Sequence, residues 1–431
     1  MKTSYICLSA ETLHHGHINL IKKANKYGEV IAGLLTDKAI VNNKRLPHLS
    51  FEQRKKLLEN IKGIKKVVPQ NHWSQEYNIL KYKPDYFVHG DDWLTNGEIE
   101  NKKRALVALK KYGGKLIEIP HTKGISSGAI LRDQMKIATT PEIRKGMLSR
   151  LLKSKKLVRV IEVHSPISAL VVENTKIKTK KEIKVFDCFW SSSLCDSIQM
   201  GKPDNEILDL SQRLDNINNI FEVSTKPLII DLDTGGKIEH FSMNIKKLER
   251  LGISAVIIED KTGLKKNSLF GNKANQTQDK ISKFCEKIRM ARKNIASDNF
   301  FIIARIESLI LKKGMKDALN RAFSYVKAGA NGIMIHSSLS TPAEVFKFAK
   351  LFRKKYSDIP LVCVPSTYSS VHEKLLEKNG FNIVIYANQI TRTIYPQMIE
   401  VTKEILKNGR SFESEKKMLN ISKIINLIPT P

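Results

Sequence analysis

The chain has 431 residues, of which 41% are hydrophobic, and a formal net charge of +30. That length predicts two domains rather than one core, and no apolar run approaches the roughly 18 residues of a membrane span. The five cysteines are scattered without a C-x-x-C pair, which indicates neither a disulfide framework nor a zinc site and favours a soluble protein of the cytoplasm.

The positive charge by itself would suit a nucleic-acid-binding protein. The lysines are instead spread along expected helices, as at 102–104 and 153–156, without interleaved aromatic residues or a known reader motif. We therefore expect solvated helix faces that attract small anionic substrates, with no nucleic-acid or membrane partner.

Short apolar runs alternate with helical segments in the first third of the chain. Between two of these runs, Leu57, Leu58 and Ile61 recur at helical spacing. Five strands alternating with helices predict a small, Rossmann-like parallel sheet, with strands at 5–8, 30–36, 66–69, 86–89 and 115–119.

A polar stretch, Ala138-Thr139-Thr140-Pro141, follows this series and favours a linker, with Pro141 in the first turn of the next helix. The expected division is a first domain over 1–135, a linker over 136–145 and a second domain over 146–431.

The segment His14-His15-Gly16-His17 follows the first expected strand and opens a helix. Backbone amides and the helix dipole favour phosphate at such a position, and two histidines around a glycine can donate hydrogen bonds to a reacting α-phosphate. Gly124-Ile125-Ser126-Ser127 precedes a second helix at the other end of the domain.

These two turns, with 50–54 and 89–93, resemble the glycerol-3-phosphate cytidylyltransferases and related nucleotidyltransferases over residues 1–132. The resemblance implies CTP as substrate and a catalytic role for His14 and His17. It implies nucleotide contacts from Ser9, Lys44, Arg54, Asp91, Ser126 and Ser127. The chain departs from the family where Ser9-Ala10-Glu11 replaces T-F-D and where His121 replaces an arginine.

The second series has eight strand candidates separated by helical patterns, which predicts a (β/α)₈ barrel. The candidates are 158–163, 185–189, 228–230, 255–258, 301–304, 332–335, 361–364 and 383–386. Polar residues recur where strands end, which is the face that carries barrel active sites; they are Trp190, Asp231, Glu259, Arg305 and His336. Residues after about 391 are expected to form further helices that pack on a neighbouring copy, giving a homo-oligomer.

The residue types at these strand ends suit a metal-bound anion. Asp231, Asp233 and Glu259 offer the hard oxygen ligands that Mg²⁺ prefers. Arg305 has a planar fork matched to phosphoryl or carboxylate oxygens, and His336 follows the next strand.

The stretch that begins Glu259-Asp260-Lys261 and continues to Ser268 resembles the E-D-K-x-x-x-K-x-N-S motif of phosphoenolpyruvate mutases, in the isocitrate lyase superfamily. The likeness spans 141 to about 410 and includes the D-x-D-T-G segment. It implies that Asp231 ligates Mg²⁺ directly, with Asp233 and Glu259 acting through waters. It further implies substrate contacts from Trp190, Ser192, Ser193, Leu194 and Ser268, and catalytic roles for Asp204, Lys265, Asn267, Arg305 and His336.

The implied reaction isomerises phosphoenolpyruvate to 3-phosphonopyruvate, and Lys265, Asn267 and Ser268 would lie on a gating loop. Phosphonopyruvate hydrolase is the alternative for the barrel. The Lys-Lys-Cys-Gly-His loop of the superfamily's lyases is absent, so lyase activity is disfavoured. The chain departs from the family's E-A-H-N-G at 162–166, and 174–184 is expected to be an expanded surface loop.

For the first domain, the fusion suggests CTP-dependent activation of a phosphonate such as 2-aminoethylphosphonate. The alternative is a nucleotide-binding module without turnover.

Overall fold

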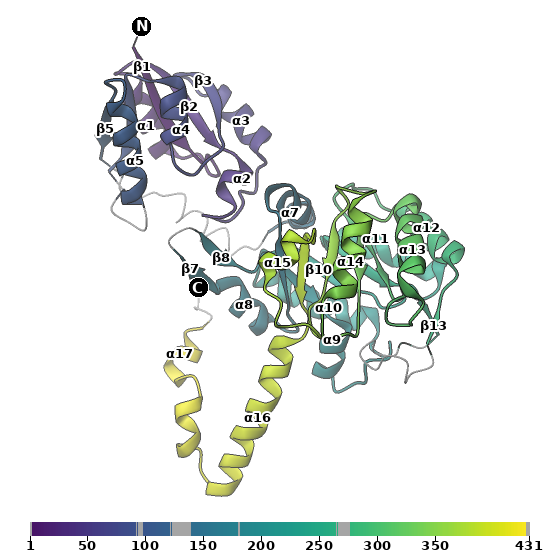
Figure 1. Ribbon diagram of the computed structural model, residues 1–431. Helices are drawn as coiled ribbons and strands as arrows, with labels where there is room; N and C mark the ends of the chain where they lie inside the picture. The colour runs from purple at the N-terminus through teal and green to yellow at the C-terminus, as the bar shows by residue number, and fades with distance from the viewer. Residues whose placement is uncertain are drawn as a thin grey trace.

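The computed structural model describes residues 2–91, 93, 98–120, 122, 139–179, 182–263, 265 and 276–427. Within them, an N-terminal α/β domain is followed by a closed barrel and a C-terminal helical segment (Figure 1).

The N-terminal domain is a five-stranded parallel sheet with strand order β3-β2-β1-β4-β5. Apolar residues on its two faces form separate cores: Ile6 and Leu8 pack with Ile21 of α1, while Tyr5 and Phe87 pack on the other face. This sheet confirms the predicted Rossmann-like fold. Its elements are β1 (Thr3–Leu8), α1 (His15–Ala24), β2 (Glu29–Leu35), α2 (Asp37–Ile40), α3 (Phe51–Glu59), β3 (Ile64–Gln70), α4 (Glu76–Tyr82), β4 (Tyr86–Gly90), α5 (Glu98–Lys110) and β5 (Lys115–Ile119).

Eight parallel strands then close into the predicted barrel. They are β6 (Val158–Glu162), β9 (Cys188–Ser191), β10 (Leu228–Asp231), β11 (Ala255–Glu259), β14 (Phe301–Ile306), β15 (Gly332–Ile335), β16 (Leu361–Cys363) and β17 (Ile383–Tyr386). The covering helices are α8 (Pro166–Asn174), α9 (Ser193–Gln199), α10 (Leu210–Glu222), α11 (Ile238–Leu251), α12 (Ile281–Lys293), α13 (Gly314–Ala328), α14 (Ala343–Arg353) and α15 (Glu373–Lys378).

The second barrel strand differs from its expected position at 185–189. It covers Cys188–Ser191, while Val185 belongs to an antiparallel hairpin of β7 (Lys176–Lys178) and β8 (Ile183–Val185). The Asp187 side chain accepts hydrogen bonds from the backbone N–H of Arg159 at 2.9 Å and from Lys155 Nζ at 2.8 Å. These bonds fix the chain between the hairpin and the barrel strand. A further short pair, β12 (Lys261–Thr262) and β13 (Thr277–Gln278), follows β11.

Helix α7 (Pro141–Ser154) covers the end of the barrel at which the strands begin. The Thr140 side chain caps it, and Met147, Leu148 and Leu151 join the apolar cluster of the barrel interior. Ser254, just before β11, donates to the carbonyl of Arg144 at 2.9 Å. Residues 141–145 of the expected linker are therefore helical.

The N-terminal domain contacts this same end of the barrel, because Val41 and Leu46 belong to the cluster that contains Leu148. Figure 1 shows α7 between the N-terminal sheet and the barrel.

The C-terminal segment consists of α16 (Gln389–Asn408), a 3₁₀ helix (Phe412–Lys417) and α17 (Ile421–Ile425). Helix α16 extends away from the barrel in Figure 1 and has no buried residue. Throughout the part of the chain that the structure describes, no helix combines the length and apolar character that crossing a bilayer requires.

Candidate active sites

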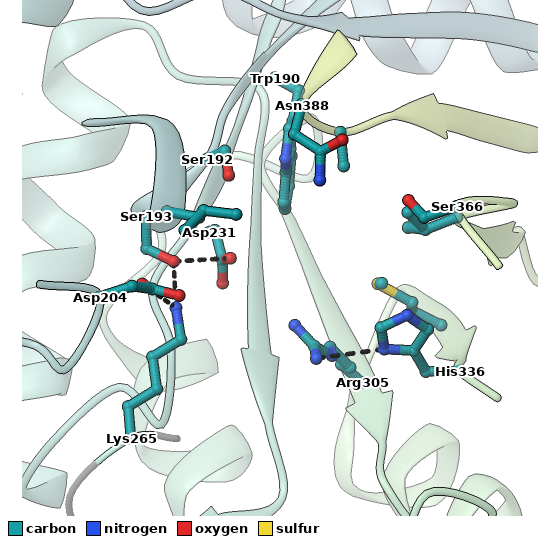
Figure 2. Close-up of a pocket in the computed structure, with 14 residues that line it drawn as sticks. Trp190, Ser192, Ser193, Asp204, Asp231, Lys265, Arg305, His336, Ser366 and Asn388 are labelled. Carbon is teal, nitrogen blue, oxygen red and sulfur yellow. Dashed lines mark hydrogen bonds and ion pairs between the residues drawn. The ribbon is translucent and has the colours of Figure 1, made fainter. Parts of the chain in front are cut away.

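A cavity opens at the end of the barrel where the strands terminate, opposite α7 (Figure 2). Four of the five strand-end residues expected there line it, namely Trp190, Asp231, Arg305 and His336, whereas Glu259 does not. The remaining lining residues are Ser192, Ser193, Leu194, Asp204, Lys265, Met334, Val364, Ser366, Ala387 and Asn388.

One wall of the cavity is a cluster of carboxylates around a single ammonium group. Lys265 Nζ lies 2.8 Å from Asp204 Oδ1 and contacts both Asp233 Oδ1 and Ser193 Oγ. Ser193 Oγ in turn donates to Asp231 Oδ2 at 3.0 Å. Figure 2 shows Ser193, Asp204, Asp231 and Lys265 facing one another from different elements. The site therefore accommodates a cation among buried oxygens.

The turn after β10 explains how two aspartates reach this wall. Asp233 adopts a left-handed conformation with φ of +53°, which Asp tolerates better than most residues. Its backbone N–H donates to Asp231 Oδ1 at 3.1 Å. Asp231 thereby caps the turn that presents Asp233.

The opposite wall is built on Arg305. Its Nε donates to Glu307 Oε1 at 2.5 Å, and its Nη2 lies 3.3 Å from Glu259 Oε2. Nη2 also donates to Nδ1 of His336 at 3.2 Å, which places the imidazole hydrogen on Nε2. Arg305 and His336 are thus held at the cavity surface, while Glu259 and Glu307 lie behind it.

Burial and neighbouring charges shift the pKa values of these groups in opposite directions. Burial, assisted by repulsion from Glu307, raises the pKa of Glu259 to about 7, and burial together with Asp231 raises the pKa of Asp233 to about 6. Burial also acts to raise the pKa of Asp231, but the cations Lys265 and Arg305 outweigh it and hold that pKa below its ordinary value. Such a spread of pKa values among neighbouring carboxyl groups is typical of functional sites.

The pKa of His336 lies below its ordinary value, which favours the neutral imidazole. Burial is the largest cause, and the Arg305 guanidinium adds to it, while Glu307 acts in the opposite direction. A neutral imidazole that accepts from Arg305 can still donate through Nε2 to an anion in the cavity.

Sequence reasoning missed two buried groups that orient this site. Glu307 binds Arg305 and directly follows β14, two residues after Arg305, so the two-residue alternation of side chains along an extended chain could have found it. Arg213 donates to the Asp231 carbonyl at 2.5 Å and to Asp196 Oδ2 at 2.9 Å, but it lies within α10 and looks like a surface residue in the sequence. Ser366 and Asn388 also follow strands and were missed.

The expected ligands Asp231, Asp233 and Glu259 do not form a ready-made metal cage. Among the described residues, no three His, Cys, Asp or Glu side chains are arranged to ligate one ion directly. The donor set still fits Mg²⁺, since that ion keeps several waters and uses one or two carboxylates, and Lys265 already places a positive charge among these oxygens.

Four of the expected site residues lie outside the described residues: Asn267, Ser268, Ser126 and Ser127. The other expected residues of the N-terminal domain are described.

The histidine motif caps α1 with its own side chains. The backbone N–H of Gly16 donates to His14 Nδ1 at 3.1 Å, and the backbone N–H of His14 donates to His17 Nδ1 at 3.3 Å. Both rings therefore carry their hydrogen on Nε2. A side chain at Gly16 would lie 2.9 Å from the His14 ring, which explains the glycine.

The two rings lie 4.0 Å apart between centroids. Burial, with smaller contributions from His14 and Lys44, lowers the pKa of His17 to about 4. His17 is consequently a neutral hydrogen-bond donor at the N-terminus of a helix, which suits it to phosphate.

Arg54 is fully buried and is engaged within the protein. It donates to the carbonyls of Ser9, Leu35 and Leu49, and its Nη2 lies 2.7 Å from Asp37 Oδ1. This geometry fits a residue that orders the backbone at Ser9, Leu35 and Leu49, close to the histidine motif. Lys44 Nζ lies over the Trp73 ring at 5.4 Å from its centroid, and the exposed Asp91 follows β4 and bonds to Ile119 through its backbone N–H.

Two families match the chain. The phosphoenolpyruvate phosphomutase family matches residues 148–406, and the cytidylyltransferase-like family matches residues 9–133. The chain is 31% identical over 281 residues to "Phosphoenolpyruvate phosphomutase" of Tetrahymena pyriformis, covering 65% of this chain and 89% of that protein. It is 34% identical over 125 residues to "Glycerol-3-phosphate cytidylyltransferase" of Bacillus spizizenii, covering 28% and 89% respectively.

Among solved structures, a phosphonopyruvate hydrolase in complex with oxalate and Mg²⁺ has a TM-score of 0.59 and 30% sequence identity, over 67% of this chain and 95% of that one. Both resemblances inferred from the motifs are thus confirmed. The chain belongs to the phosphoenolpyruvate phosphomutase family and carries a cytidylyltransferase-like domain ahead of its barrel.

Proposed function

We propose that the barrel isomerises phosphoenolpyruvate to 3-phosphonopyruvate with Mg²⁺. The observation that carries this proposal is the division of the cavity. Arg305 and a neutral His336 offer donors on one wall, and the carboxylates around Lys265 lie on the other. A substrate with a phosphoryl group at one end and a carboxylate at the other would span them, with Mg²⁺ offsetting the repulsion between that carboxylate and the wall.

The reaction breaks the phosphorus–oxygen bond of the substrate and forms a phosphorus–carbon bond to its C3, with no net gain or loss of protons. Arg305 would hold the phosphoryl oxygens while the group is loosely bonded, and Glu307 keeps the guanidinium aimed at the cavity. Ser192 and Ser193, at the start of α9, would bind the carboxylate through backbone amides and hydroxyls. Trp190 would pack against the enolate as it turns.

When bound through Asp231, with Asp233 and Glu259 acting through waters, Mg²⁺ would stabilise the negative charge of the enolate. Lys265 and the segment after it, which includes Asn267 and Ser268, would exclude water from the phosphoryl group. Exclusion is essential, because water would otherwise capture the group as inorganic phosphate.

Phosphorus NMR tests this proposal and separates it from the hydrolase. The purified protein with Mg²⁺ and phosphonopyruvate should form phosphoenolpyruvate with little free phosphate. Inorganic phosphate formed as fast as phosphonopyruvate disappears would establish the hydrolase instead. No phosphorus-containing product at all would refute both.

For the N-terminal domain we propose CTP-dependent cytidylyl transfer to a phosphonate, with release of pyrophosphate. The support is the pair of imidazoles at the start of α1, both with Nε2 hydrogens, because such donors stabilise charge that develops on a phosphate. The acceptor we favour is a phosphonate such as 2-aminoethylphosphonate, since the barrel would supply its precursor.

Pyrophosphate release from CTP and a panel of phosphonates and phosphate esters tests this second activity. His17→Ala should abolish release without changing the barrel reaction. His15→Ala is the matched control, because His15 lies in the same motif but is exposed. CTP binding without pyrophosphate release for any acceptor would identify a binding module.

We also propose that the barrel assembles into a homo-oligomer through α16, which exposes Tyr395, Met398 and Leu406. Sedimentation analysis of the full chain tests this, and a monomer at micromolar concentration would contradict it.

A further inference from the structure

The loop between α2 and α3, residues 41–50, joins the N-terminal domain to the barrel, and we call it the docking loop. Val41 and Leu46 are buried in the cluster that contains Leu148 and Leu151 of α7. The backbone N–H of Ile183, in β8, donates to the carbonyl of Asn42 at 2.9 Å. The docking loop is therefore packed on elements that belong to the barrel.

Arg150 of α7 binds the second half of the docking loop. Its Nη1 donates to the carbonyls of Pro47 and His48, at 2.5 and 2.9 Å, and its Nη2 donates to that of Leu49 at 3.2 Å. Nη2 also lies 3.0 Å from Asp37 Oδ2. One guanidinium of the barrel domain thus fixes three successive carbonyls and a carboxylate of the other domain.

Two of these partners are shared with Arg54. Asp37 accepts from Arg150 through Oδ2 and from Arg54 through Oδ1, and the Leu49 carbonyl accepts from both arginines. Arg54 then reaches the Ser9 carbonyl, just after β1 and before the histidine motif. A continuous set of charge-assisted bonds leads from α7 to the backbone of the nucleotide site.

Arg45 provides an independent attachment of the first half of the docking loop. Its Nη1 lies 3.2 Å from Glu173 Oε1 of α8, and its Nη2 donates to the Thr225 carbonyl at 3.0 Å. The Thr225 hydroxyl also donates to Glu173 at 3.0 Å, so this acceptor is held in place. The neighbouring residue, Lys44, is one of the expected nucleotide contacts.

We infer that the barrel domain positions the nucleotide site, and that Arg150 and Arg45 are positioning residues for it. Held by these arginines, the docking loop keeps Lys44 and the Arg54–Ser9 contact in the arrangement that binds CTP. This inference rests on the proposed nucleotide-binding function of the N-terminal domain.

The test compares full-length variants by isothermal titration with CTP and Mg²⁺, and by hydrogen–deuterium exchange of the docking loop. Arg150→Gln should weaken CTP binding at least about tenfold, as expected for loss of charge-assisted bonds, and should speed exchange in 41–50. Arg150→Lys should recover part of the affinity, because it keeps the charge but not the fork. Arg45→Gln should act in the same direction.

Arg353→Gln is the matched control. Arg353 likewise binds backbone carbonyls, those of Gly380, Tyr356, Ser357 and Ile359, but within the barrel and away from the docking loop. It should leave CTP affinity and exchange in 41–50 unchanged.

Unchanged CTP affinity in both Arg150→Gln and Arg45→Gln, with a wild-type chain that binds CTP, would overturn this inference alone. A wild-type chain that does not bind CTP would overturn the proposed function and this inference together.

Discussion

Replacing Arg305 by Lys keeps a positive charge at the cavity but removes the planar fork. The guanidinium contacts Glu307 at 2.5 Å, His336 at 3.2 Å and Glu259 at 3.3 Å. A single ammonium group cannot satisfy all of these partners and also bind a phosphoryl group. The loss of one preorganised donor to a transition state lowers turnover by about 10²–10³-fold, or about 2.7–4 kcal/mol.

We therefore expect Arg305→Lys to reduce kcat/KM for phosphonopyruvate by about two to three orders of magnitude, measured by phosphorus NMR of product formation. Leaving a buried carboxylate partly unsatisfied should also lower the free energy of unfolding by about 1–3 kcal/mol.

Arg159→Lys is the control for this prediction. Arg159 also lies on a barrel strand and donates two hydrogen bonds to one carboxylate, Glu373, both at 2.7 Å, but it does not line the cavity. It should lower stability and leave turnover intact. Turnover within tenfold of wild type in Arg305→Lys would refute the role given to the guanidinium fork.

Three further predictions concern Mg²⁺ binding, the pH dependence of that binding, and the contact between Gly252 and α7. Asp231→Asn should keep the fold but greatly weaken Mg²⁺ binding in calorimetry, because a neutral amide is a poor ligand for Mg²⁺; wild-type affinity would exclude direct ligation. Mg²⁺ affinity should rise between pH 6 and 8, since the pKa values of about 6 for Asp233 and about 7 for Glu259 mean that protons leave these carboxyls as pH increases; a flat profile would contradict a role for them. Gly252→Ala should lower the free energy of unfolding by at least about 1–2 kcal/mol in urea titrations, because Gly252 has φ of +86° and a Cβ would lie 2.5 Å from Pro141 of α7; equal midpoints would show that this contact yields easily.

The strands and the strand-end residues of the barrel could be predicted from the sequence because two simple regularities define them. Buried parallel strands are short apolar runs, and polar residues that follow them meet at one face. Both regularities hold for Asp231 and Arg305. The second strand was misplaced because Val185 and Phe189 lie in one apolar stretch of the sequence. In the structure, the hydrogen bonds of Asp187 mark the boundary between the hairpin and the barrel strand.

Partners brought together by folding could not be predicted in the same way. Arg213 and Arg54 look like ordinary helix-surface cations in the sequence, yet both are buried against carbonyls and carboxylates contributed by other segments. The docking loop shows the same limit. Its contacts to Arg150 are mostly made by backbone carbonyls. Every residue has a backbone carbonyl, so the sequence gives no sign of which ones are used.

The position of the N-terminal domain, over the end of the barrel opposite the cavity, constrains how the two proposed activities can cooperate. Among the residues that the structure describes, apolar side chains such as Ile229, Ile257 and Met334 fill the barrel axis between them, so the proposed product, phosphonopyruvate, has no passage along that axis. We therefore expect phosphonopyruvate to leave by the cavity and a derivative of it to reach the proposed nucleotide site through solvent. An added enzyme that consumes phosphonopyruvate should intercept all of it, and the fusion would then secure a fixed one-to-one ratio of the two proposed activities.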